Sequence, residues 1–384
     1  MAGGEPARPL LRRRPDRTVC RLTSGPASPT ASPRSLGGPP RTPSAHPCRS
    51  RRRNHRSTRK APPVITEHHI ILGPVRTRYF EAGSPRTTSV VLIHEGGFGS
   101  DAPNTFGRMA DSLASTHHVL MPEMLGFGGT DKAVFFGEDP YEPRLRHLAS
   151  FLAALDVRSA HIVGNSFGGG IVLRMSIHPE TAWRMRSATS ISGTGGPFRT
   201  AEAIKYTSQY DLTLDDARRL DGWVIDPGLS DEEHAVARYE SSLRPGQWES
   251  MMAGTLRSPA AAAPSPAAPD YPAALSASTV PTLLVAGILD PMFEKGWEDE
   301  IASYLSDVRI ERPDAGHAPN ISQPAMTAEL LRGFFDEVDA RWPSSPASPH
   351  PQLSDHREGP PIHRGERPEP PPAHRPHNGT VTKQ

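Results

Sequence analysis

A serine between two glycines is the strongest chemical signal in this sequence. Residues 164–168 read Gly-Asn-Ser-Phe-Gly, so Ser166 stands at the centre of a Gly-x-Ser-x-Gly pattern. A short β-rich run, residues 160–163, precedes the pattern, and an apolar segment, residues 171–173, follows it. This order predicts a sharp turn from a strand into a helix, with the serine hydroxyl exposed at the turn. The alternative is a glycine-rich turn with an incidental serine, and it does not account for both flanking elements.

A serine hydroxyl is a weak nucleophile unless a base takes its proton and a third group orients that base. His317 ends the run Asp-Ala-Gly-His, and Asp290 ends the run Gly-Ile-Leu-Asp; each run directly follows a predicted strand. Asp314 is an alternative acid that lacks this strand-then-Gly-x-x-Asp setting. The chain order Ser, Asp, His is that of the α/β-hydrolase fold. We therefore predict Ser166 as nucleophile, His317 as base and Asp290 as the acid that orients the base.

Attack by serine on a carbonyl creates an oxyanion, which needs two backbone donors already aimed at it. One predicted donor is the N–H of Phe167, the residue after the nucleophile. The second should come from the loop His-Glu-Gly-Gly-Phe-Gly at residues 94–99. Gly96 is the preferred donor in that loop and Gly97 the close alternative, whereas His94 is expected to be a structural hydrogen-bonding residue.

The elements that must position these residues alternate along the chain between short β-rich runs and helical patterns. An antiparallel pair opens the series, and later strands are near-continuous apolar runs, typical of strands buried on both faces. This alternation predicts an α/β fold with a mostly parallel sheet flanked by helices, of the α/β-hydrolase type. The predicted strands are residues 70–72, 75–80, 90–93, 118–121, 160–163, 188–192, 282–286 and 308–311, and the clearest helices are 141–156 and 325–338.

Composition divides the chain into a folded body and two tails. Residues 61–342 are the predicted hydrolase domain, a comfortable size for one α/β unit. Within it, residues 197–253 contain several helical patterns but no clear strand, and they predict an inserted lid. The Ala- and Pro-rich residues 258–277 predict a loose connection from the lid back to the sheet. Residues 1–60 and 343–384 are rich in Pro, Ser and Arg or in Pro and His, and both are predicted to be disordered.

Charge follows the same division, with a net charge of +13 on the first 60 residues and −13 on the body. The basic tail resembles an organelle transit peptide in composition, and equally a start site placed too early. No folded nucleic-acid module accompanies it, so a nucleic-acid partner is not expected. No apolar run is long enough to span a bilayer. Both cysteines, Cys20 and Cys48, lie in the tail, which suits a reducing compartment, and a cytoplasmic location without membrane contact is the expectation.

Four segments together resemble the meta-cleavage product hydrolases, α/β-hydrolases that cut a carbon–carbon bond in dienol acids formed by ring fission of catechols. The resemblance extends from about residue 66 to 338. It is found in the loop 94–99, in Met-Pro-Glu-Met-Leu-Gly-Phe-Gly at 121–128, in the turn 164–169, and in Ala-Arg-Tyr-Glu-Ser-Ser-Leu-Arg-Pro-Gly at 237–246. The Asn before the nucleophile and the arginine of the last segment are its more specific features.

The resemblance implies that Arg238 binds a substrate carboxylate and that Asn165 and Asn104 contact the dienol oxygens. For Arg238 a salt bridge to Glu240 or another lid carboxylate is the alternative, and for Asn104 a plain turn position after Pro103. The implied chemistry has two stages. The dienolate is first protonated on carbon to a ketone, and then the serine, or a water activated by the histidine, attacks the remote carbonyl so that the carbon–carbon bond breaks.

Three positions depart from the family pattern. Ala318 stands where Trp commonly follows the catalytic His, Glu95 where Gly is usual in the oxyanion loop, and Glu123 where the Pro-Asp loop has its acid. A carboxylesterase or lactonase with a small acyl substrate is therefore the alternative function. A non-catalytic small-ligand binder is a third, against which the complete triad argues.

The sequence also indicates which cofactors and partners to expect. No cluster of residues with metal-ligand spacing occurs, so no metal and no organic cofactor is expected. The predicted partner is a small-molecule substrate, and a homo-oligomer is left open.

Overall fold

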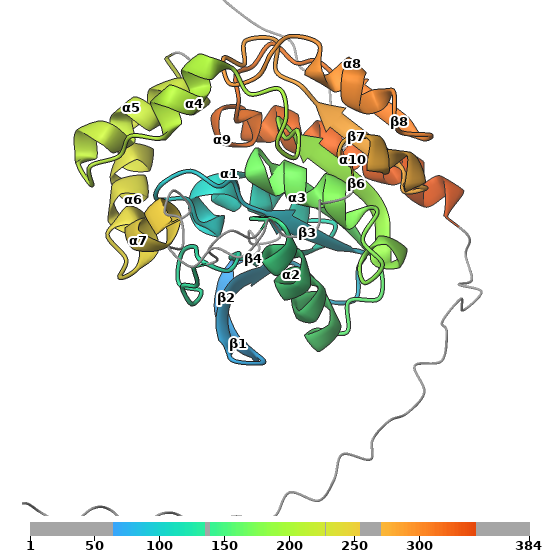
Figure 1. Cartoon of the computed structure of the whole chain (residues 1–384). Helices are drawn as coiled ribbons and strands as arrows, with labels where there is room; N and C mark the ends of the chain where they lie inside the picture. Colours follow the sequence, from blue (N-terminus) through green and yellow to red (C-terminus); the bar gives the residue numbers. More distant parts are fainter. Residues whose placement is uncertain (1–63, 135–138, 227, 254–269, 343–384) are drawn as a thin grey trace, which may run out of the picture. The chain divides into compact units, whose positions relative to one another are not determined.

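One mixed sheet contains the strands that the sequence predicted (Figure 1). The computed structural model describes residues 64–134, 139–226, 228–253 and 270–342, all within the unit Lys60–Gln384. The two predicted terminal tails and the first part of the Ala- and Pro-rich connection lie outside the described residues.

Within the described residues the sheet has eight strands in the order β1-β2-β4-β3-β5-β6-β7-β8. β2 runs antiparallel to both β1 and β4, and the other neighbours are parallel. The strands are β1 (Thr66–Leu72), β2 (Val75–Ala82), β3 (Ser89–Ile93), β4 (His118–Pro122), β5 (Ala160–Asn165), β6 (Met185–Ile191), β7 (Thr282–Val285) and β8 (Val308–Glu311). The predicted fold class, a mostly parallel sheet flanked by helices, is confirmed.

Helices cover both faces of this sheet. The α-helices are α1 (Ala102–Ala114), α2 (Glu142–Ala154), α3 (Phe167–Met175), α4 (Ala201–Thr207), α5 (Leu214–Val224), α6 (Glu232–Ser242), α7 (Gln247–Met252), α8 (Trp297–Ala302), α9 (Pro319–Ser322) and α10 (Pro324–Arg341), with short 3₁₀ helices at Ala182–Arg184 and Ala273–Ala277. On β3, Val90 and Leu92 pack in one core with side chains of α1 and α10, whereas Val91 and Ile93 pack in another with α2 and α3. Successive strand residues point to opposite faces, so an all-apolar strand buries both.

Four helices, α4 to α7, interrupt the alternation between β6 and β7, where the sequence predicted an inserted lid. Figure 1 shows them together at the upper left of the view, and α6 contacts α1. The side chains of Thr200, Thr213 and Asp231 accept hydrogen bonds from the first turns of α4, α5 and α6 and fix where these helices begin. Tyr210 of this insertion stacks on Phe98 of the loop after β3, with ring centroids 4.8 Å apart. The insertion therefore packs onto the predicted oxyanion loop.

Strand register brings four loops to one edge of the sheet. Ile93 at the end of β3 is paired with Gly164 of β5, so the loop after β3 lies beside the Ser166 turn. Val285 at the end of β7 lies between Ile191 of β6 and Glu311 of β8. Because carboxyl ends of neighbouring parallel strands share an edge, the loops with the predicted oxyanion donor, nucleophile, acid and base meet there.

Candidate active site

Ser166 occupies a strained turn between β5 and α3. Its backbone has φ 53° and ψ −116°, a conformation that costs a non-glycine residue about 1–3 kcal/mol. The turn is held by the Ser166 N–H, which donates to the carbonyl of Ile191 at 2.8 Å, and by the Ser166 carbonyl, which accepts from Gly170 N–H at 3.0 Å. This is the geometry of a nucleophile elbow, in which the turn exposes the serine at the sheet edge.

Close backbone approach explains the glycines on either side of Ser166. A Cβ atom on Gly164 would overlap the carbonyl of Gly168, and one on Gly168 would overlap the carbonyl of Ile93. No side chain fits at either position without moving a strand. The pattern that the sequence displayed is thus a packing requirement of the turn.

His317 and Asp290 form the second part of the site. The Nδ1 atom of His317 lies 2.8 Å from Oδ2 of Asp290, and both side chains are almost completely buried. The other carboxylate oxygen, Oδ1, accepts from the N–H of Met292 at 2.8 Å. Leu289 N–H donates to the carbonyl of Ala315 at 3.0 Å, which ties the Asp290 loop to the His317 loop. With Nδ1 directed to the carboxylate, Nε2 is the ring nitrogen left for proton transfer.

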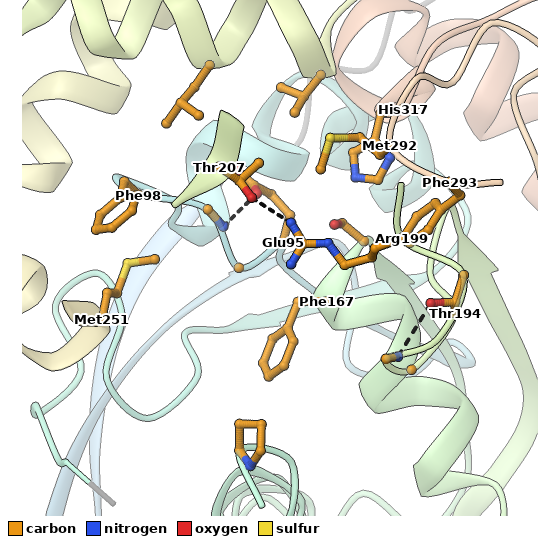
Figure 2. Close-up of a pocket in the computed structure, with 18 of the residues that line it drawn as sticks. Glu95, Phe98, Phe167, Thr194, Arg199, Thr207, Met251, Met292, Phe293 and His317 are labelled. Carbon is orange, nitrogen blue, oxygen red and sulfur yellow. Dashed lines mark hydrogen bonds between the residues drawn. The ribbon is translucent and has the colours of Figure 1, made fainter. Parts of the chain in front are cut away.

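The predicted nucleophile and the predicted base line the same cavity, which has a volume of about 420 Å³. Ser166, Phe167, His317 and Gly96 all contribute to its lining. Much of the remaining wall is apolar, and Figure 2 shows Phe98, Met251, Met292 and Phe293 among the residues around it. The apolar lining fits the hydrocarbon part of a small organic substrate.

The two predicted oxyanion donors lie close to one another. A Cβ atom on Gly96 would come within 2.7 Å of Cβ of Phe167, so the chain at Gly96 has no room for a side chain. The N–H of Gly97, the alternative donor, is already used, because it donates to Oε2 of Glu95 at 2.8 Å. Among the hydrogen bonds of the described residues none uses the N–H of Gly96. The unbonded N–H of Gly96 and its closeness to Phe167 favour Gly96 over Gly97 as the second oxyanion donor.

Arg238 reaches the cavity from α6 but is enclosed by ion pairs. Its Nη1 atom lies 2.9 Å from Oε1 of Glu95 and donates to the carbonyl of Phe98 at 2.9 Å, while Nε donates to Oδ1 of Asp221 at 2.6 Å. Asp221 in turn binds Nδ1 of His234 at 2.7 Å. The side chains of Arg238, Glu95 and Asp221 are all buried. The salt bridge considered from the sequence is present, with Glu95 and Asp221 as partners, and substrate binding by Arg238 stays a prediction.

Glu95, the departure from the family pattern, therefore forms an ion pair with the inserted helix α6. Burial by itself would raise the pKa of Glu95, but the nearby guanidinium of Arg238 and the hydrogen bond from the Gly97 N–H outweigh it and lower the pKa to about 2. The carboxylate is thus ionised over the whole working range of an enzyme. His94 beside it is buried, with Nδ1 at 2.7 Å from the Glu95 carbonyl and Nε2 accepting from Met124 N–H at 3.0 Å, the structural position expected of it.

Asn165 and Asn104 are not among the described residues that line the cavity. The Asn165 amide lies beneath the turn and donates to the carbonyls of Ile191 and His317, at 3.2 Å each, and so braces the histidine loop. Asn104 is at the start of α1, and its carbonyl lies 3.1 Å from Nε2 of His234. Contact of either side chain with substrate stays a prediction.

Sequence reasoning missed two residues near the site. Arg199 lines the cavity from the loop after β6, and Asp226, after α5, accepts hydrogen bonds from the N–H of Gly316, from Ser322 Oγ at 2.9 Å and from Gln323 Nε2 at 2.7 Å. Each is a lone charged residue in a loop, without a spacing pattern. Nothing in the sequence distinguished them from solvated charges.

Among the residues that the structure describes, no group of three or more His, Cys, Asp or Glu side chains is arranged to hold a metal ion. In the same part of the chain, none of the helices is both long and apolar enough to cross a membrane.

Comparison with known proteins agrees with this geometry. A model of the alpha/beta hydrolase family matches residues 90–330, from β3 into α10. This chain belongs to that family. The hydrolase is 29% identical over 282 residues to 2-hydroxymuconate semialdehyde hydrolase of Pseudomonas sp. strain CF600, with 71% of this chain and 94% of the relative covered. It is 30% identical over 259 residues to the protein of the same name from Pseudomonas putida, with 65% and 88% covered.

Solved structures of related enzymes have the same fold as this hydrolase. 2-hydroxy-6-oxo-6-phenylhexa-2,4-dienoate hydrolase from Rhodococcus sp. strain RHA1 superposes with a TM-score of 0.60 at 22% identity, over 71% of this chain and 99% of that one. The meta-cleavage product hydrolase of Pseudomonas fluorescens IP01 also superposes with a TM-score of 0.60, at 24% identity, over 70% and 97%. The resemblance to meta-cleavage product hydrolases predicted from the sequence is confirmed by these relatives.

Proposed function

We propose that this enzyme hydrolyses a carbon–carbon bond in a 2-hydroxy-6-oxo-hexa-2,4-dienoate type of substrate. The observation that most supports hydrolysis is the strained Ser166 at a cavity shared with His317, whose Nδ1 faces Asp290. The substrate class is supported by relatives named 2-hydroxymuconate semialdehyde hydrolase and 2-hydroxy-6-oxo-2,4-heptadienoate hydrolase.

In the first stage the bound dienolate takes a proton on carbon and becomes a ketone. His317 is the group that we assign to this proton transfer, because Asp290 engages its Nδ1, which leaves Nε2 for the substrate, and the residue lines the cavity. The buried carboxylate of Asp290 stabilises the imidazolium whenever the ring holds the extra proton.

In the second stage an oxygen nucleophile attacks the remote carbonyl. The nucleophile is Ser166, or a water that gives its proton to His317. The carbon–carbon electron pair leaves with the dienol fragment, and water is consumed to give a carboxylic acid as the second product. The oxyanion that forms is stabilised by the N–H groups of Phe167 and Gly96, each worth several kcal/mol in a dry site.

The helices α4 to α7 are the proposed lid within residues 197–253 of a hydrolase domain spanning residues 61–342. Leu220 and Val224 of α5 and Met251 of α7 line the cavity. This packing excludes water from the dienoate and strengthens electrostatic interactions inside the site.

The test follows the decay of visible absorbance of a 2-hydroxy-6-oxo-hexa-2,4-dienoate in parallel with hydrolysis of p-nitrophenyl acetate. A much higher kcat/KM for the dienoate is the expected result. Cleavage of the ester alone would contradict carbon–carbon hydrolysis and leave the esterase alternative. The buried Ala318 and the Glu95–Arg238 pair would then be the first positions to exchange.

A further inference from the structure

Three side chains with a permanent charge line the described cavity: Glu95, Arg199 and Arg238. An anionic substrate needs one of the two arginines to be available. Arg199 and Arg238 differ in their ion pairs, and this difference indicates which of them binds the anion.

The positive charge of Arg238 is already neutralised by its protein partners. It contacts two ionised carboxylates, Glu95 at 2.9 Å and Asp221 at 2.6 Å, and the carbonyl of Phe98. A ligand carboxylate at Arg238 would therefore lie beside the carboxylate of Glu95, whose pKa is about 2. In a buried site the repulsion between two such charges is poorly screened. Binding there would require Glu95 to leave its partner.

Arg199 is placed differently. Its side chain is exposed at the cavity, and in the described part of the chain no carboxylate forms an ion pair with it. The backbone of Arg199 is held by a β-bridge to Phe293, and Nη2 donates to Oγ1 of Thr207 at 2.5 Å. Figure 2 shows this hydrogen bond, which directs the guanidinium across the cavity toward α4. The hydrogen bond to Thr207 thus orients the Arg199 guanidinium, while its other N–H groups have no carboxylate partner among the described residues.

We propose that Arg199, and not Arg238, receives the carboxylate of the substrate. This inference rests on the proposed function of the same site. A planar guanidinium can bind a carboxylate through two parallel, charge-assisted hydrogen bonds. Arg238 is a positioning residue instead, because it holds Glu95, whose carboxylate accepts the N–H of Gly97 next to the oxyanion donor.

The experiment compares mono-p-nitrophenyl succinate, an anionic ester, with the neutral p-nitrophenyl butyrate. Arg199→Gln should raise KM for the anion at least about tenfold more than KM for the neutral ester, the factor expected from losing one charge-assisted pair. Thr207→Val, which removes only the orienting hydrogen bond, should give a smaller shift in the same direction. Arg158→Gln removes an equal charge from an exposed loop distant in the chain and is the matched control.

Ionic strength supplies an independent readout. KM of the wild type for the anionic ester should rise with added salt, and the rise should be flatter in Arg199→Gln, because the screened charge is gone. Thermal unfolding of each variant separates a binding defect from loss of fold. Equal changes for both esters in Arg199→Gln, or an anion-specific change in Arg238→Gln alone, would overturn the proposal.

The experiments distinguish failure of the proposed function from failure of the Arg199 assignment. If the dienoate is not cleaved, the ester pair still compares anionic with neutral ligands at the same site. If no substrate turns over, calorimetry with Ser166→Ala measures the Kd of the anionic ester directly. That Kd should be weakened about tenfold when Arg199→Gln is added. No binding by Ser166→Ala, or an unchanged Kd in the double variant, would refute the assignment.

Discussion

The sheet edge and the lid hold their functional groups by different kinds of interaction. At the edge, Ser166 is fixed by backbone hydrogen bonds, and the Asp290 and His317 loops are tied by the bond from Leu289 N–H to the Ala315 carbonyl. In the lid, Arg238 is fixed by the carboxylates of Glu95 and Asp221. Backbone hydrogen bonds do not titrate, whereas these ion pairs require ionised carboxylates. Ser166 is thus positioned independently of charge, whereas the contact of Arg238 with the oxyanion loop depends on ionised carboxylates; the stacking of Tyr210 on Phe98 joins the two regions without charge.

The largest effect should come from the edge. Ser166→Ala removes the proposed nucleophile, and kcat should fall at least about 10³-fold because the members of such a triad act as a unit. Stability should not fall, because alanine fits the turn as well as serine. Steady-state assays and thermal unfolding measure both quantities. Ser150→Ala, at an exposed position on α2, is the matched control. Near-wild-type kcat in Ser166→Ala would exclude Ser166 as the nucleophile and leave only the water activated by His317.

The next largest effect should come from the lid pair. Glu95→Gln leaves the buried Arg238 with one charged partner instead of two, and breaking such a pair costs about 3–5 kcal/mol. Urea unfolding should show this loss, while Glu240→Gln on the exposed face of α6 should show none. If both variants unfold alike, the pair does not stabilise the lid.

The same pair predicts how stability depends on pH. The pKa of Glu95 is lowered from 4.5 to about 2 in the folded state, so its stabilising contribution is complete above about pH 4.5. It is lost as the pH falls through about 2. The gap in unfolding free energy between wild type and Glu95→Gln should therefore narrow from pH 5 downward. A gap that is constant over this range would show that Glu95 is not ionised in the pair.

A smaller effect is expected where the two regions meet. Asp226, after α5, accepts the N–H of Gly316 next to His317. Asp226→Ala should cost about 1–3 kcal/mol, because buried donors lose their acceptor, and should also lower kcat by displacing the histidine loop. Asp226→Asn keeps an acceptor oxygen and should restore most of kcat. Loss of stability without any change in kcat would limit Asp226 to a structural role.

The smallest effect should come from ion pairs on the outer face of the lid. Arg218 contacts Asp215 at 2.6 Å and Glu232 at 2.5 Å, but all three side chains are exposed. Water and salt screen such pairs, so Arg218→Gln should leave the Tm unchanged. If Arg218→Gln lost as much stability as Glu95→Gln, burial would not explain the difference in strength between exposed and buried ion pairs.

The sequence by itself determined the sheet edge. The glycines around Ser166, the strand before the turn, and the acid and base placed directly after later strands are local patterns. The chain order of the triad and the apolar strands were enough to predict the fold, because buried parallel strands and their carboxyl-end loops follow from hydropathy and short motifs. The elements found in the structure agree with those patterns.

Only the tertiary structure decided what the charged side chains do. Arg238 pairs with Glu95 and Asp221, and Asp226 contacts the His317 loop 90 residues away along the chain. Arg199 is left at the cavity without a carboxylate partner in the described part of the chain. Long charged side chains can reach many partners, and their local sequence does not record which one they meet. The packing of the lid on the sheet edge makes that choice.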